Sequence, residues 1–221
     1  MPHPAPSGPA VAEAPPSARS GPIPPQQARS RAALQRLLAS AEHVLVNDGI
    51  DEFTIARVAD HAGISVGGVY RRFASKEQLI EAIREALMER LEDAVAQAFH
   101  HAEPSVAGVM DAFTAALGET MADCGRIIPA VLAGARSVDV PERGLRTVIN
   151  LQEWFFEAIA PHQREIRHPD PTAALNIAFR TVIAGGAHRA AIEPWLPDGL
   201  TWQQWAREIA DMTTTYLTAE R

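Results

Sequence analysis

The sequence of 221 residues has little of several residue types, and each shortage excludes a class of protein. A single cysteine, Cys124, excludes an intrachain disulfide and is typical of a reducing compartment. No run of about 18 or more apolar residues occurs, so no membrane-spanning helix is predicted. The N-terminus lacks the apolar core of a secretory signal, and we therefore expect a cytoplasmic protein.

Signals for strands and for catalysis are also scarce. β-Branched residues are scattered without a convincing alternating run, which predicts an all-helical fold. No phosphate-cradling loop, zinc-spaced ligand set or Gly-x-Ser-x-Gly elbow is present, so we expect no enzyme, metal or cofactor. Cys124 with a distant histidine stays open as a nucleophile pair, although a lone cysteine is most often a small buried residue. His100 and His101 end a helical pattern, where the helix dipole favours solvated histidines over a metal site.

Two segments precede the most informative part of the chain. Residues 1–28 are rich in Pro, Ala, Ser and Gly and predict a disordered arm. The basic residues Arg19, Arg29 and Arg31 can reach a minor groove, and a tail without a role is the alternative. Leucines and alanines at helical spacing then predict an amphipathic helix from Ser30 to Asp48 that ends near Gly49.

The stretch from Thr54 to Leu79 has the pattern of two short helices joined by a tight turn, with a third helix directly behind them. Thr54 and Ser65 are good N-cap residues for the first two helices. Gly63 ends the first helix, because glycine enters left-handed backbone space without a Cβ penalty. This pattern is typical of a helix-turn-helix, whose second helix lies in the DNA major groove.

The residues of this stretch also stand in the order and spacing of one known family. They are Thr54, Ala59, Gly63-Ile64-Ser65, Gly67-Gly68, Tyr70, Phe73, Ser75-Lys76 and Leu79. Residues 29–84 thereby resemble the DNA-binding domain of the TetR family of transcriptional regulators. Gly68 departs from the pattern, because the family usually carries Thr, Ser or Ala there. The departure removes a possible hydroxyl contact to phosphate and costs about 1 kcal/mol of helix propensity relative to Ala.

The formal net charge of −7 is unusual for a DNA-binding protein, but the charge is unevenly distributed. Residues 29–84 carry eight basic and seven acidic side chains, and most of the remaining acidity lies downstream. Arg71, Arg72 and Lys76 lie close together in the sequence, and such clustering decides a phosphate footprint. The charge therefore excludes indiscriminate coating of nucleic acid but not a local DNA site.

The chemistry of DNA recognition divides the candidate contacts into two groups. Tyr70 and Lys76 match the family's phosphate-contacting positions, although the Tyr70 ring can equally pack in the core. Thr54 and Arg57 are candidates for the other edge of the groove. The candidate base readers are Ser65, Val66, Gly67 and Arg71, since Val66 can touch a thymine methyl and Arg71 can bind guanine. Arg72 serves a phosphate or a salt bridge, and a solvated surface arginine without such a role is the alternative.

Helical patterns continue through residues 85–221, which we expect to form a larger helical body. The expected helices are Ser75–Phe99, Val106–Met121, Gly125–Ser137, Glu142–Ala160, Thr172–Ala191 and Trp202–Leu217. A polar loop is expected from Arg164 to Pro171, and a break at residues 193–199. The small residues of the helix Thr172–Ala191 allow close helix packing, either within one chain or between two.

The resemblance implies that this body binds a small-molecule effector and forms a homodimer through its last two helices. Soft, aromatic and isolated polar side chains are the candidate ligand contacts, and ordinary core packing is the alternative for the apolar ones. They are Met110, Phe113, Met121, Arg126, Trp154, Phe155, Phe179, Arg180 and His188, with Trp195 beside them.

The sequence thus predicts an all-α protein with three parts: a disordered arm (1–28), a helix-turn-helix head (29–84) and an effector-binding and dimerisation body (85–221). The resemblance implies a repressor that a ligand releases from a palindromic duplex operator. A helical scaffold or ligand-binding protein with a weakened DNA-binding head is the alternative.

Overall fold

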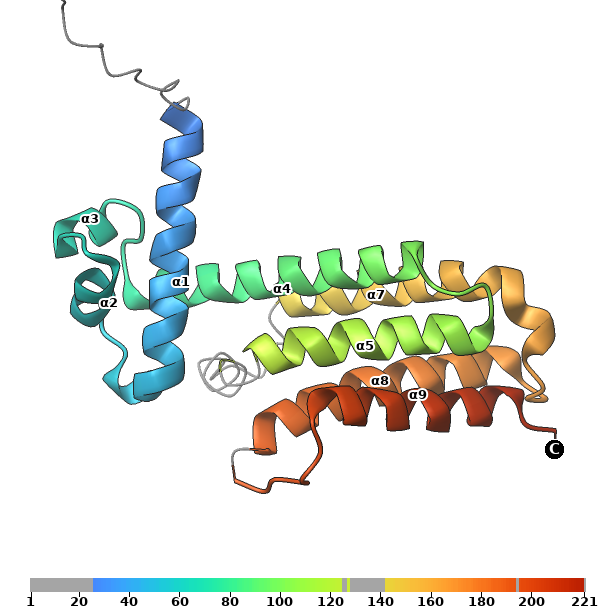
Figure 1. Ribbon diagram of the computed structural model, residues 1–221. Coiled ribbons are helices and arrows are strands. Elements are labelled where there is room, and N and C mark those ends of the chain that lie inside the picture. The colour runs from blue at the N-terminus through green and yellow to red at the C-terminus, as the bar shows by residue number, and fades with distance from the viewer. Residues whose placement is uncertain (1–25, 125–126, 128–141, 194, 221) are drawn as a thin grey trace, which may run out of the picture.

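The computed structural model describes residues 26–124, 127, 142–193 and 195–220, and within these ranges it contains helices and no strand. Figure 1 shows two parts, a small head that contains α1, α2 and α3 and an elongated body of roughly parallel and antiparallel helices. The long helix α4 begins in the head and runs along the body beside α5 and α7. The all-helical fold with an N-terminal head and a larger body confirms the predicted fold class.

The head consists of α1 (Gln26–Glu52), α2 (Ile55–Ala62) and α3 (Val66–Tyr70). The start expected for α1, at Ser30, is wrong: the helix begins four residues earlier, inside the range assigned to the arm. Its predicted end is confirmed in part, because Gly49 has non-helical backbone angles and a last helical turn follows to Glu52. The pattern of polar glutamines at residues 26 and 27 carries no apolar periodicity, which is why the sequence did not mark this extra turn.

Local hydrogen bonds set the turn between α2 and α3. The hydroxyl of Thr54 accepts the amide of Arg57, and the hydroxyl of Ser65 accepts the amide of Gly68, so both predicted N-caps are confirmed. Gly63 adopts the left-handed conformation with φ of 66°, and Ile64 N–H bonds back to the Ala59 carbonyl. This arrangement satisfies the last carbonyls of α2 and turns the chain into α3.

Helix α4 (Lys76–His100) connects two apolar cores. Its first turns place Leu79 and Ile83 in the head core with Phe53 and Val58. Its later turns place Leu87, Leu91 and Val95 in the body core. Ser75 caps this helix through the amide of Gln78, as predicted. Helix α4 is therefore buried in the cores of both the head and the body.

The body helices follow the predicted order with small shifts at their ends. They are α5 (Val106–Cys124), α7 (Glu142–Ile159), the 3-10 helix η1 (Ala160–Glu165), α8 (Pro171–Ile192) and α9 (Trp202–Thr218). The expected loop starts at Ile166 rather than at Arg164, because η1 extends the helical path of α7. The helix expected at Gly125–Ser137 lies almost entirely outside the described residues.

Small residues bring the body helices close together within one chain. A Cβ on Gly118 of α5 would lie 3.2 Å from the Trp202 carbonyl oxygen of α9. A Cβ on Gly186 of α8 would lie 2.9 Å from the Leu117 side chain of α5. These two glycines are therefore used inside the chain, where they permit the contact of α5 with α8 and α9.

One residue of the segment that follows α5 joins the head. Ile127 is 2% exposed and packs in the same apolar cluster as Leu37, Val58 and Ile83. The body therefore touches the head core at a second point in addition to α4.

Candidate DNA-binding surface

Helix α3 presents part of the expected DNA-contacting surface to solvent. Val69 is fully buried and anchors α3 against the head core. On the other side, Val66 is 42% exposed and Tyr70 is 51% exposed, and Ser65 and Gly67 are exposed as well. These four residues form one exposed surface on which a base edge or a phosphate can be contacted.

Two of the other expected contacts are already engaged within the head. The Arg57 guanidinium lies 2.7 Å from a carboxylate oxygen of Asp48 and 3.3 Å from one of Glu52. Its backbone amide donates to the hydroxyl of Thr54. Arg57 therefore fastens the start of α2 to the end of α1, and Thr54 caps α2, while both side chains remain exposed to solvent.

Lys76 is also turned inward. Its ammonium donates a hydrogen bond of 3.0 Å to the carbonyl of Ile50 and lies 5.6 Å from the centre of the Phe53 ring. Ile50 directly follows the kink at Gly49, where a helical carbonyl loses its regular partner. The single lysine thus stabilises the end of α1, and the side chain is half-buried.

Arg71 and Arg72 line a pocket of about 520 Å³ beside α3. The opposite wall comes from α1 and includes Arg36 and Leu37. Arg36 was missed as a site residue by sequence reasoning. Its position on the polar side of the first amphipathic helix was readable, but the sequence did not show that this side faces the turn between α2 and α3.

The expected ligand contacts of the body divide into buried and exposed groups. Met110, Phe113, Phe155 and Phe179 are at most 1% exposed, and the rings of Phe113 and Phe179 stack at 5.7 Å between their centroids. Met121 is buried in the same cluster, and Trp154 packs against it half-buried. The structure therefore brings these six residues together as a continuous apolar core.

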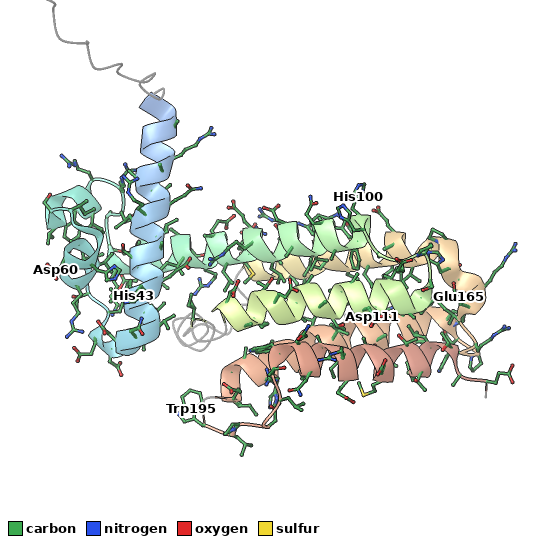
Figure 2. All side chains as sticks on the ribbon, viewed as in Figure 1. His43, Asp60, His100, Asp111, Glu165 and Trp195 are labelled. Carbon is green, nitrogen blue, oxygen red and sulfur yellow. The ribbon has the colours of Figure 1, made fainter. Side chains whose placement is uncertain are left out.

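The polar candidates of the body do not join this core. Arg180 and His188 are exposed on α8, and Trp195 is 75% exposed and projects from the loop after α8 (Figure 2). Arg126 lies outside the described residues.

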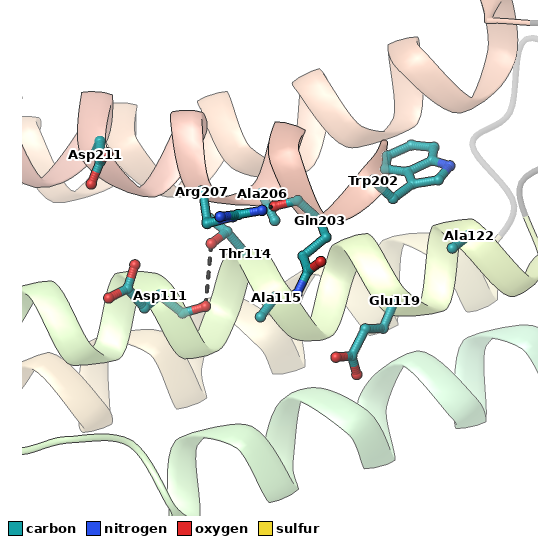
Figure 3. Close-up of a pocket in the computed structure, with 10 residues that line it drawn as sticks. All are labelled: Asp111, Thr114, Ala115, Glu119, Ala122, Trp202, Gln203, Ala206, Arg207 and Asp211. Carbon is teal, nitrogen blue, oxygen red and sulfur yellow. Dashed lines mark hydrogen bonds between the residues drawn. The ribbon is translucent and has the colours of Figure 1, made fainter. Parts of the chain in front are cut away.

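A separate groove of about 540 Å³ runs between α5 and α9 (Figure 3). Its lining includes Asp111, Glu119, Arg207 and Asp211, none of which was a sequence-predicted contact. Burial raises the pKa of the Asp111 carboxyl, and the negative charge of Asp211 raises it further. Arg207 extends along α9 and donates to the Gln203 carbonyl, so its side chain crosses only part of the groove.

The part of the chain that the structure describes lacks metal-binding clusters and membrane-spanning helices. It contains no group of three or more histidine, cysteine or acidic side chains that could hold a metal ion. None of its helices is long and apolar enough to cross a membrane. The rings of His100 and His101 meet edge to face at the end of α4.

Comparison with protein families agrees with the position of this surface. The model described as bacterial regulatory proteins of the tetR family matches residues 37–83, which include α2, α3 and the start of α4. The HTH-type transcriptional regulator BetI 2 of Chromohalobacter salexigens is 35% identical over 69 residues. That match covers 31% of this chain and 33% of the relative, so the chain spans about a third of its length.

Solved structures of low sequence identity share the fold over most of the chain. The TetR family regulator PfmR from Thermus thermophilus is 21% identical with a TM-score of 0.62, covering 84% of this chain and 100% of its own. FadR from Bacillus subtilis, in complex with stearoyl-CoA, is 12% identical with a TM-score of 0.65 and coverages of 83% and 99%. The ketosteroid regulator KstR2 of Mycobacterium tuberculosis is 16% identical with a TM-score of 0.62 and coverages of 91% and 99%.

Proposed function

We propose that this chain, a member of the TetR family of transcriptional regulators, binds a palindromic duplex operator through α3 and is released from it by a small molecule. The observation that carries the proposal is the exposed surface of α3, held by a buried Val69 and flanked by the arginines of the adjoining pocket. Val66 and Gly67 are proposed to meet base edges, and Tyr70 a phosphate. DNA as the partner also favours a cytoplasmic location.

Lys76 and Arg57 have a further role in this proposal. Both stabilise the packing of α1 on the rest of the head, so they hold α3 in position through contacts with Ile50, Asp48 and Glu52. Lys76 has three ammonium protons, and those not given to Ile50 remain for a phosphate oxygen.

The test is selection of bound sequences from random duplex DNA with the purified protein at two salt concentrations. We expect enrichment of a palindrome, because a two-fold dimer presents two copies of α3 to two half-sites. Affinity should fall as salt rises, since phosphate neutralisation releases counterions. Lack of enrichment by a folded protein, freed of bound small molecules, would contradict the DNA-binding role.

A dimer through α8 and α9 is part of the proposal. Ile177 of α8 and Met212 of α9 are 52% and 50% exposed, so each of these two neighbouring helices presents a large apolar side chain that a partner could cover. Ile177→Glu should weaken self-association in sedimentation velocity measurements. Leu196→Glu, a change of the same kind at a 70% exposed loop residue, is the matched control.

The effector is proposed to enter the body at the apolar cluster around Phe113, Phe155 and Phe179. These side chains fit an apolar molecule, and the similarly folded FadR structure contains stearoyl-CoA. Helix α4 and Ile127 both join body and head, so separation of the body helices would shift the position of α3. Such a population shift requires that the ligand prefer one of the two arrangements.

Mass spectrometry of small molecules extracted from the purified protein tests the effector. The expected result is an apolar compound whose return lowers affinity for the selected DNA. A Phe113→Leu variant should respond to a different concentration of that compound. An unchanged response in that variant would remove Phe113 from the proposed site.

A further inference from the structure

The pocket beside α3 differs from the rest of the head in its charge. Its lining contains three arginines and no acidic side chain: Ala33, Arg36, Leu37, Ala62, Gly63, Ile64, Ser65, Gly68, Arg71 and Arg72. Helices α1, α2 and α3, the turn between α2 and α3, and the two residues after α3 supply this lining, so the pocket exists only in the folded head. All three arginine side chains are exposed to solvent.

The three pocket arginines differ from Arg57, Arg84 and Arg90 in their ion pairing. Arg57 pairs with Asp48, Arg84 with Glu81, and Arg90 with Glu42. In the ranges that the structure describes, no ion pair involves Arg36, Arg71 or Arg72. Because these three like charges have no carboxylate partner in the described residues, an external anion would stabilise them more than it would the arginines that are already paired.

Gly68 opens the base of this pocket. A Cβ built on Gly68 would lie 3.3 Å from the Ser65 hydroxyl oxygen and 3.7 Å from Nη2 of Arg71. The Arg71 guanidinium therefore folds back over α3, beside the position that a side chain at residue 68 would take. The glycine at the position where the family pattern has Thr, Ser or Ala leaves this space to the arginine.

We propose that this pocket binds a phosphate group of the DNA backbone, with Arg36, Arg71 and Arg72 as its ligands. This inference rests on the proposed DNA-binding function and adds to it a contact from α1. It also changes the role of Arg71 from reading guanine to holding phosphate. A guanidinium presents several N–H donors in a planar fork that matches phosphate oxygens.

The DNA backbone is the favoured source of the phosphate because the pocket and the exposed surface of α3 share residues. Ser65 belongs to both the pocket and the exposed surface of α3. Arg71 of the pocket directly follows Tyr70, the last residue of α3. A duplex that receives α3 in its major groove carries phosphates along both edges of that groove. Free phosphate is the other source of the same chemistry, and the experiment separates the two.

The experiment measures binding of the full chain to mixed-sequence duplex DNA over a range of salt concentrations, by fluorescence anisotropy. Arg36→Gln and Arg72→Gln should each reduce the slope of log affinity against log salt by about one, because each loses one phosphate contact. The loss should be equal for all sequences. Arg146→Gln, which removes the same charge from an exposed pair on α7, should leave the slope unchanged.

Three results would overturn the proposal while leaving the proposed function intact. The first is an unchanged slope of log affinity against log salt in both Arg36→Gln and Arg72→Gln. The second is a changed base preference in Arg71→Gln. The third comes from adding inorganic phosphate to the proteins without DNA: the variants lose the stabilisation that phosphate gives the wild type, yet keep the wild-type salt slope for DNA. The last result would make the pocket a site for a free anion. If the wild-type protein binds no duplex at any salt concentration, the proposed function itself fails, and the phosphate titration of wild type and Arg36→Gln then shows whether an anion site exists at all. Circular dichroism of each variant checks its fold.

Discussion

Two arginines of the body and three of the head differ in how they are partnered. In the body, Arg143 donates to both carboxylate oxygens of Glu92 at 2.8 Å and also to Glu85. Arg189 is 6% exposed, and two of its guanidinium nitrogens donate hydrogen bonds to the two carboxylate oxygens of Asp198. The same guanidinium lies 4.2 Å from the centre of the Trp202 ring. In the head, Arg36, Arg71 and Arg72 form none of the ion pairs in the described residues. The comparison shows that Arg143 and Arg189 connect parts of the body through ion pairs, whereas Arg36, Arg71 and Arg72 form no such connection within the described residues.

The largest effect should come from the apolar core of the body. Phe113→Ala removes a fully buried ring that contacts Phe99, Phe155 and Phe179. We expect the free energy of unfolding to fall by about 4 kcal/mol, because transfer and cavity terms add. Chemical denaturation measures it. Trp195→Ala at the exposed loop should change stability by less than about 0.5 kcal/mol, and a similar loss at both positions would contradict the assigned core.

Breaking the α4–α7 ion pairs should have the next largest effect. Arg143→Gln leaves Glu92, whose side chain is 14% exposed, without its main partner. We expect a loss of about 3 kcal/mol in the free energy of unfolding, because an uncompensated, nearly buried carboxylate is costly. Arg146→Gln on the same helix breaks only an exposed pair with Glu142 and should cost less than about 0.5 kcal/mol. Equal losses of stability in Arg143→Gln and Arg146→Gln would show that burial does not make one ion pair more stabilising than the other.

Lys76 tests whether a cation of the head can also be structural. Lys76→Met keeps the alkyl chain over Phe53 but removes the hydrogen bond to the Ile50 carbonyl. We expect a loss of about 2 kcal/mol, the usual range for a hydrogen bond from a charged group. Thermal unfolding without DNA measures it. A variant of wild-type stability would mean that Lys76 serves only the DNA.

The Arg189–Asp198 pair predicts a dependence of body stability on acid. Hydrogen bonds from Arg189 lower the pKa of Asp198 to about 2, with a contribution from the amide of Leu200. Since the folded-state pKa is lower than the usual 3.8, the pair stabilises the fold fully above that value and loses this contribution as pH falls toward about 2. Denaturation of wild type and Asp198→Asn across this range measures it. The difference between them should shrink with acid, and a constant difference would contradict the pair.

The smallest effect on stability should come from the pocket of the head. Arg36→Gln and Arg72→Gln remove charges that form no ion pair in the described residues. The free energy of unfolding should therefore change by less than about 0.5 kcal/mol in each variant. Their effect should appear only in the salt dependence of DNA binding. Differential scanning calorimetry of both variants measures the change in stability. A large destabilisation would show that these arginines have a structural role that none of the described contacts explains.

Much of the fold was predictable because its signals are local. Thr54, Ser65 and Ser75 cap the helices expected of them, and Gly63 takes the left-handed conformation that ends α2. Apolar spacing placed the described body helices α5, α7, α8 and α9 correctly to within a few residues, and the helix expected at Gly125–Ser137 stays a prediction. The start of α1 was wrong because its first turn is polar and carries no such spacing.

The site was predictable as a segment but not as a set of contacts. The exposure of Val66 and Tyr70 on α3 agrees with their expected roles, which stay proposals. Arg57 and Lys76 were expected to face DNA, and the structure shows them bound to Asp48 and Ile50 of α1. Arg36 was not expected at all, because its neighbours in the pocket lie about 30 residues later in the chain.

The sequence by itself determined the helices, their caps and the helix-turn-helix, because these depend on residues within a few positions of one another. Only the tertiary structure decided which cations are held in ion pairs and which are not. Arg143 binds Glu92, which lies 51 residues earlier in the chain, and Arg90 binds Glu42, which lies 48 residues earlier. Such partners depend on which helix faces pack together, and apolar periodicity marks the buried face of each helix without naming its neighbour.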